Sequence, residues 1–102
     1  MAKVVFTNPA KFDLLDLEHY IFTELKNPQA ANRIIDGILN VAQSSRTNPQ
    51  RHSLLNDKIL KQVGLRIVPF NNYNIFYHYD AKSDLIYIIR ILYNRVDWKN
   101  IL

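Results

Sequence analysis

The sequence predicts an α+β domain in which two helices pack on one face of a four-stranded sheet. Two stretches carry apolar residues at helical spacing, and a proline opens each of them. One short strand-like run precedes them and three follow, all rich in β-branched and aromatic residues. At 102 residues, 48% of them apolar, the chain can bury one core, so we expect a single domain over residues 1–102.

Residues 4–7 form the first expected strand, and a helix should follow it. Asn8 is a suitable N-cap, and Pro9 fits the first helical position, where its missing N–H costs nothing. One apolar stripe at helical spacing should be buried: Ala10, Leu14, Leu17, Ile21 and Leu25. A second stripe lies on another side, so this helix is packed on two sides or leaves one for a partner: Phe12, Leu15 and Phe22.

The second expected helix covers about residues 28–44 and begins with the pair Asn27-Pro28. Its apolar stripe is Ala31, Ile34, Ile35, Ile38, Val41 and Ala42. Gly37 lies in mid-helix and suggests a close approach between the two helices. Because the link between the helices is short, we expect an antiparallel hairpin.

Three strands should close the domain after Gly64, over residues 65–70, 73–79 and 85–93. The polar segment before them includes a possible helical turn over residues 53–60. Short polar connections between the three strands predict an antiparallel meander. The last two strands are apolar on both faces, which fits central positions with helices on one side and a groove or partner on the other.

Composition excludes several classes of protein. There is no cysteine, so disulfides, thiolate metal sites and a cysteine nucleophile are ruled out, and the three histidines are too far apart for a metal signature. No signal peptide and no apolar run long enough for a membrane helix is found, so we expect a cytoplasmic protein. Residues 51–102 hold eight Lys/Arg against four Asp/Glu and carry the whole net charge of +4, which fits an acidic or phosphate-bearing partner as well as ordinary solvated charge.

Two arginines lie inside otherwise apolar strands. Arg66 and Arg90 each need solvent, a partner or an anion, because a buried charge without a partner is costly. We expect them on neighbouring strands, where both could contact one phosphate. Pairing with a carboxylate, or exposure at a strand end, is the structural alternative.

A histidine and a tyrosine are further candidates for catalysis. His78 could exchange a proton near neutral pH, although a half-buried, hydrogen-bonded histidine explains it better. Tyr93 could stack on a base or act as an acid or base, and packing at a strand end is the alternative.

Three more cations are candidates for binding nucleic acid or a partner. Lys58 and Lys61 precede the meander, and a solvated face is the more ordinary reading of both. Arg95 follows the last strand and could instead pair with Asp97, while Trp98 anchors the tail on the sheet.

The ordered set of motifs resembles the RelE/ParE superfamily of toxins from type II toxin–antitoxin modules, including its plasmid-stabilisation branch. The resemblance runs nearly end to end and rests on Phe6-Thr7-x-Pro9-Ala10, Asn27-Pro28-x-Ala30-Ala31, Gly64-Leu65-Arg66, Asn72-Tyr73-x-Ile75-Phe76-Tyr77 and Ile88-Ile89-Arg90-Ile91-Leu92-Tyr93-x-Arg95-x-Asp97-Trp98. It implies a small basic toxin that a cognate antitoxin neutralises. That antitoxin should be acidic, partly disordered alone, and wrap the toxin with an amphipathic segment. The docking candidates are the stripe with Phe12 and a groove beside Arg66 and Arg90.

Members of this superfamily differ in mechanism. RelE-like members cleave mRNA in the ribosomal A site without a metal or other cofactor, and ParE-like members inhibit DNA gyrase without cleavage residues. Arg66 and Arg90 favour mRNA cleavage here, because they match positions where RelE-like toxins often carry strand arginines. RelE-like enzymes often use a C-terminal tyrosine or histidine, whereas this chain ends in Asn100-Ile101-Leu102. Gyrase inhibition, and a non-catalytic homologue that only binds antitoxin, are the alternatives.

Overall fold

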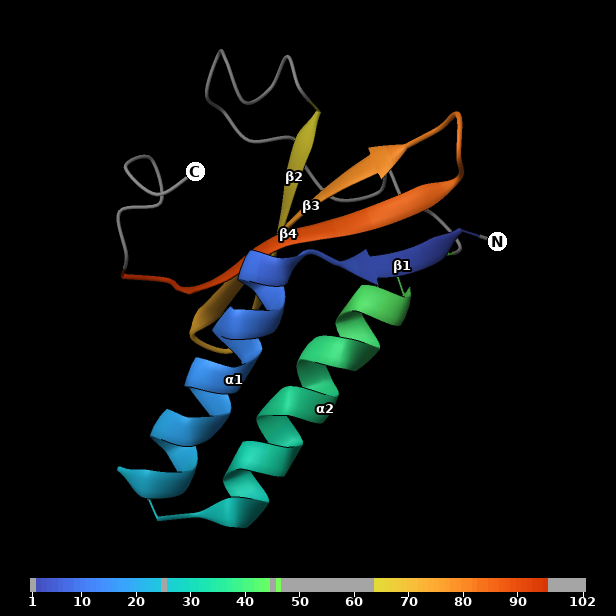
Figure 1. The fold of residues 1–102 in the computed structure, drawn as a ribbon. Coiled ribbons are helices and arrows are strands. Elements are labelled where there is room, and N and C mark those ends of the chain that lie inside the picture. The colour runs from blue at the N-terminus through green and yellow to red at the C-terminus, as the bar shows by residue number, and fades with distance from the viewer. Residues whose placement is uncertain (1, 25, 45, 47–63, 96–102) are drawn as a thin grey trace.

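A computed structural model describes residues 2–24, 26–44, 46 and 64–95 (Figure 1). Strand β1 is followed by a helical hairpin and then by three more strands. In chain order the elements are β1 (Lys3–Phe6), α1 (Asn8–Thr23), α2 (Pro28–Ser44), β2 (Leu65–Phe70), β3 (Tyr73–Asp80) and β4 (Leu85–Tyr93). The predicted α+β fold is confirmed. The expected helical turn over residues 53–60, and Leu25, lie outside the described residues.

The sheet has the strand order β1-β4-β3-β2. Strands β2, β3 and β4 form the expected antiparallel meander, and β1 pairs with β4 in parallel, with Val4 opposite Ile86. A parallel pair needs a long crossover, which the helical hairpin begins. Strand β3 therefore lies between β2 and β4, and β1 covers one edge of β4.

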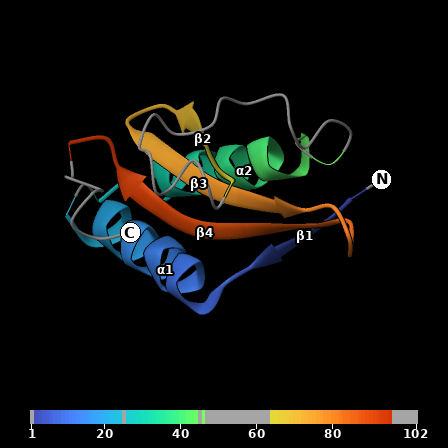
Figure 2. The ribbon, with the colours of Figure 1, turned by 90° about the horizontal axis from the view of Figure 1, so that it is seen from above.

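Both helices lie on the same side of the sheet, as Figures 1 and 2 show. Helix α1 packs against β4, and α2 packs against β2 and α1. The largest fully buried side chains of this layer are Ile21, Ile38, Ile75, Tyr77, Ile86 and Ile88. A smaller cluster on the opposite face of the sheet consists of Leu65, Phe76 and Leu92, with Ile67 and Ile89 packed against it.

The two helices begin differently from one another. Asn27 caps α2 as expected, since its side-chain oxygen accepts the N–H of Ala30 at 3.1 Å. At α1 the expected cap, Asn8, is wrong: Thr7 is the N-cap. The Thr7 hydroxyl accepts the N–H of Ala10 at 3.4 Å and donates to the carbonyl of Ile88 at 2.8 Å. One side chain thus caps α1 and ties its start to β4.

Gly37 permits a close approach, but to the sheet and not to the other helix. A Cβ atom at this position would lie 2.0 Å from Cζ of Phe70 in β2, far inside the contact distance. The expectation that Gly37 faces α1 is therefore corrected. The absent side chain allows the Phe70 ring to pack directly on the α2 backbone.

Candidate functional site

Arg90 is held by Asp13, which projects from α1. The guanidinium donates from Nε to Oδ2 at 2.8 Å and from Nη2 to Oδ1 at 2.9 Å, and Oδ2 also accepts the backbone N–H of Ile91 at 2.9 Å. Both side chains are mostly buried, with 24% of Arg90 and 11% of Asp13 exposed. The hydrogen bonds to Asp13 raise the pKa of Arg90, while burial opposes that rise.

Two features of the backbone place Arg90 beside Asp13. The β3–β4 register shifts between Phe76 and Tyr77, so that Phe76 stands opposite Arg90 and Tyr77 opposite Ile88. Ile89 is the extra residue of a bulge, a device that redirects neighbouring side chains. Pairing with β1 ends at Ile88, so the following edge of β4 is open to Asp13.

The structure does not place Arg66 on the strand next to Arg90. Strand β3 separates β2 from β4, so the expectation that the two arginines lie on neighbouring strands is wrong. Arg66 stands opposite Tyr77, which is buried in the core beneath the helices. Because directly opposed residues share a face of the sheet, Arg66 lies on the helix side of β2. A clamp formed by both guanidinium groups on one phosphate therefore loses its geometric basis.

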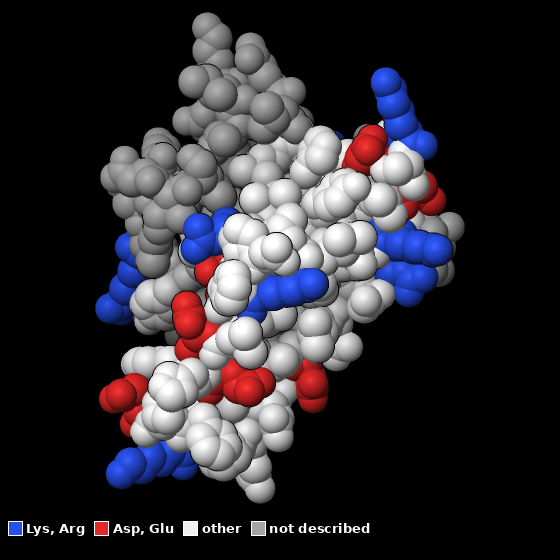
Figure 3. Space-filling view, in the orientation of Figure 1, with Lys and Arg blue, Asp and Glu red and all other residues white. Residues whose placement is uncertain are grey.

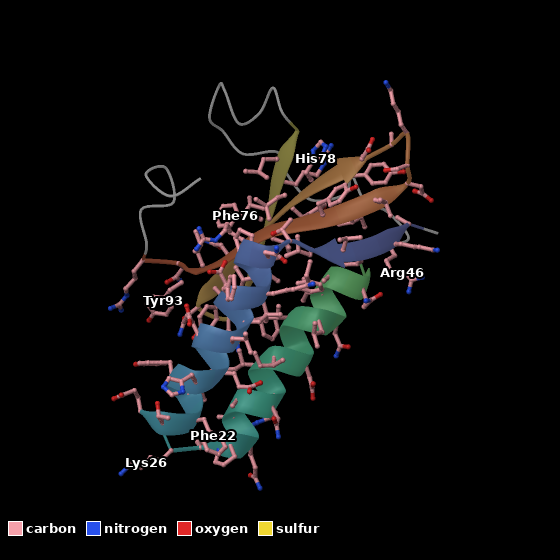
Figure 4. The ribbon with its side chains drawn as sticks, in the orientation of Figure 1. Phe22, Lys26, Arg46, Phe76, His78 and Tyr93 are labelled. Atoms are coloured by element: carbon pink, nitrogen blue, oxygen red, sulfur yellow. The ribbon has the colours of Figure 1, made fainter. Side chains whose placement is uncertain are left out.

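His78 lies on the face of the sheet turned away from the helices (Figure 4). It stands opposite Leu65 on β2, and its Nδ1 is buried without a hydrogen-bond partner among the described residues. Nδ1 therefore does not make the expected hydrogen bond within that part of the chain. Arg90 stands opposite Phe76, two residues before His78 on β3, but its guanidinium is held by Asp13. The role of His78 as an acid or base stays a prediction.

Tyr93 borders a groove between α1 and the ends of β3 and β4. Its ring meets that of Tyr73 edge to face, with centroids 5.6 Å apart, and 39% of Tyr93 is exposed. Tyr20 of α1 lines the opposite wall, and Leu17, Ile21 and Ile91 line the groove as well. We call this hollow of about 860 Å³ the tyrosine groove.

The rim of the tyrosine groove carries two carboxylates of α1, Asp13 and Asp16. The helix holds three carboxylates and one lysine, and acidic side chains run over it in Figure 3, so it is an acidic region on a basic protein. Burial raises the pKa of the Tyr73 hydroxyl, and the nearby Tyr93 and Tyr20 add to that rise.

The second apolar stripe of α1 is exposed. Of the two arrangements expected from the sequence, this is the one in which α1 is not packed on both sides. Phe12, Leu15 and Phe22 keep 64%, 60% and 57% of their surface. Leu15 and Phe22 line a shallow hollow together with Glu18 and His19. We call Phe12, Leu15, His19 and Phe22 the outer stripe. Figure 4 shows Phe22 near the end of the helical hairpin that is remote from the sheet.

The other expected site residues are only partly described. Arg95 is exposed after β4, while Lys58, Lys61, Asp97 and Trp98 lie outside the described residues. Over the described part of the chain, no three His, Cys, Asp or Glu side chains are placed to hold a metal ion. Neither described helix has the length and apolar character needed to cross a bilayer.

Sequence reasoning missed Asp13 as the partner of Arg90. The two residues are 77 positions apart, and nothing in the sequence connects them. It also missed Asp16, Tyr20 and Tyr73 as parts of a groove. The only available signal was the spacing of Asp13, Asp16 and Tyr20, which places these three on one side of a helix.

A family model described as the ParE toxin of the type II toxin–antitoxin system parDE matches residues 4–98. Similar solved structures include the toxin–antitoxin complex RelBE2 from Mycobacterium tuberculosis, with 21% identity, a TM-score of 0.66, and 90% of this chain and 96% of that one covered. They also include a chromosomal ParDE system from P. aeruginosa, with 17% identity, a TM-score of 0.70, and 91% and 96% covered. No curated protein matches the sequence.

Proposed function

The chain belongs to the family of ParE toxins of type II toxin–antitoxin systems, and on that premise we propose that it arrests growth by binding DNA gyrase and not by cleaving mRNA. The proposal reverses the prediction of mRNA cleavage that Arg66 and Arg90 suggested from the sequence. Both targets lie in the cytoplasm, where the chain would act.

The Arg90–Asp13 pair is the observation that carries this proposal. Cleavage of RNA through the 2′-hydroxyl needs cations that stabilise the crowded phosphate. Arg90 already makes two charge-assisted hydrogen bonds to a carboxylate, and breaking them to bind a phosphate would leave Asp13 poorly compensated. Arg66 is separated from Arg90 by β3 and offers no second arm of the same clamp. A toxin that acts only by binding its target does not need Arg66 or Arg90 to contact a phosphate.

Ribosome-dependent mRNA cleavage is the second candidate. His78 favours it, because its Nδ1 has no hydrogen-bond partner among the described residues and is not engaged by the fold there. It would require a phosphate-stabilising cation other than Arg90, and Arg66, Lys58, Lys61 and Arg95 are the candidates that the sequence offers. Tyr93 borders the tyrosine groove on the helix side of the sheet, so it would have to act there and not beside His78.

We also propose that an acidic antitoxin docks on the outer stripe of α1. Both similar structures are of toxin–antitoxin systems, and large exposed apolar side chains of this kind mark protein interfaces. Phe12, Leu15 and Phe22 offer the anchors that an amphipathic segment uses. The net charge of +4 would favour association with an acidic partner.

Two assays with the purified toxin test the choice of target. In a supercoiling assay with DNA gyrase, the toxin should block supercoiling of a relaxed plasmid, and antitoxin should restore it. In a translating ribosome system with mapped mRNA ends, the message should stay intact. Cut mRNA with normal supercoiling would establish the nuclease instead. If expression without antitoxin is harmless, the chain is a non-catalytic homologue that only binds antitoxin.

A further inference from the structure

The tyrosine groove combines exposed aromatic faces with hydroxyls that no described residue binds. Tyr20 keeps 53% of its surface and Tyr93 keeps 39%, although both lie beside a packed core. Within the described residues, the hydroxyls of Tyr20, Tyr73 and Tyr93 have no hydrogen-bond partner. The groove therefore presents aromatic surface and hydrogen-bonding capacity to an occupant from outside the chain.

The two carboxylates on the rim differ in what they already bind. Asp13 is engaged by Arg90 and by the N–H of Ile91. Asp16 is exposed and has no ion pair or hydrogen bond within the part of the chain that the structure describes. One negative charge is thus available at the rim, next to tyrosine rings.

We propose that the tyrosine groove receives an arginine side chain of the antitoxin, which pairs with Asp16 and lies against the tyrosine rings. The inference rests on the proposed function, since it names how the same antitoxin completes its contact. A guanidinium fits this chemistry because it is flat, stacks on aromatic faces and forms a fork that matches a carboxylate. A carboxylate of the antitoxin at this rim would instead be repelled by Asp16.

The groove and the outer stripe are continuous on α1. Phe12, Asp16 and Tyr20 follow one another at four-residue spacing, so each lies one helical turn beyond the last. A segment that covers Phe12 therefore reaches Asp16 without leaving the helix. The antitoxin would bind apolar side chains on the outer stripe and place its arginine over the rim of the groove.

A charge reversal with a matched control tests the inference. The probe is the purified product of the reading frame that adjoins the toxin gene, and its affinity is measured for wild type, Asp16→Lys and Asp36→Lys. Both variants change an exposed helical carboxylate by the same charge. Asp16→Lys should weaken binding by about tenfold or more, while Asp36→Lys, on α2 and outside both the tyrosine groove and the outer stripe, should bind an acidic antitoxin unchanged or tighter.

Reversing the partner's charge provides the second arm. One arginine-to-glutamate change in the antitoxin should weaken binding to wild-type toxin and restore binding to Asp16→Lys. Equal or tighter binding of Asp16→Lys would overturn the inference, as would the absence of any such arginine. Both toxin variants should still arrest growth when expressed alone, and loss of arrest by Asp16→Lys alone would assign the groove to the target. If the wild-type toxin neither arrests growth nor binds the adjoining product, the proposed function itself has failed.

Discussion

Asp13 holds Arg90 with both carboxylate oxygens and uses one of them for the N–H of Ile91 as well. One side chain of α1 therefore fixes the side chain of Arg90 and the backbone of the next residue. The contact lies where β1 no longer covers the edge of β4. It fastens the helix layer to the sheet at the point where the sequence suggested a catalytic arginine.

Removing this contact should destabilise the fold. In Asp13→Ala, a mostly buried guanidinium and a backbone N–H lose their acceptor, so the free energy of unfolding should fall by about 1–3 kcal/mol. Urea denaturation followed by circular dichroism measures the change. Asp16→Ala is the control and should stay within about 0.5 kcal/mol of wild type, because Asp16 is exposed and unpaired within the described residues. Equal decreases in the free energy of unfolding of both variants would show that the Arg90–Asp13 ion pair does not stabilise the fold beyond an exposed carboxylate.

A side chain at position 37 should destabilise the fold, although alanine favours a helix more than glycine does. Alanine normally stabilises a helix by about 1 kcal/mol relative to glycine, but here its Cβ would meet the Phe70 ring at 2.0 Å. We expect Gly37→Ala to lower the free energy of unfolding by about 1–3 kcal/mol, the usual cost of overpacking. Adding Phe70→Leu should recover part of that loss, so the double variant should be more stable than the sum of the single changes predicts. Strict additivity would refute the clash.

The outer stripe should matter for binding and not for stability. Phe12 is 64% exposed, so Phe12→Asp should change the free energy of unfolding by no more than about 0.5 kcal/mol. Its affinity for antitoxin should fall at least about tenfold, because an apolar anchor becomes a charge facing an acidic partner. Asn40→Asp, exposed on α2, adds one negative charge away from α1 and should bind nearly as wild type does. Calorimetric titration of both variants decides this.

Stability should decline at alkaline pH in part through Tyr73. Its pKa in the folded protein lies above the ordinary value of 10.0, with burial as the main cause. A raised pKa means that folding favours the neutral hydroxyl, so its contribution is complete below pH 10 and is lost as the pH rises through the folded-state pKa. Tyr73→Phe should therefore lose less stability than wild type between pH 9 and about pH 11, measured by urea denaturation. Parallel losses would contradict the assignment.

The fold was predictable because its signals are local. Apolar spacing predicted both helices, and short polar connections predicted the meander of β2, β3 and β4. The cap of α1 was misplaced by one residue, because Thr7 and Asn8 are both good caps and only contact with the Ile88 carbonyl favours Thr7.

The site was less predictable because its contacts are distant in sequence. Nothing near Arg90 indicates that a bulge at Ile89 and the end of β1 pairing open its way to Asp13, 77 positions earlier. The meander itself places β3 between β2 and β4, so the proposed closeness of Arg66 and Arg90 overlooked the strand order. The tyrosine groove forms only because α1 packs against β4. The spacing of apolar residues within α1 does not specify that placement.

Growth arrest by a toxin without the ion pair tests the central claim, which is that Arg90 serves Asp13 and not a phosphate. Arg90→Met combined with Asp13→Leu replaces both charges by apolar side chains, an exchange that proteins often tolerate. Once circular dichroism shows that the variant is folded, it should arrest growth as the wild type does when expressed without antitoxin. A folded double variant that no longer arrests growth would contradict the claim and return Arg90 to the functional site.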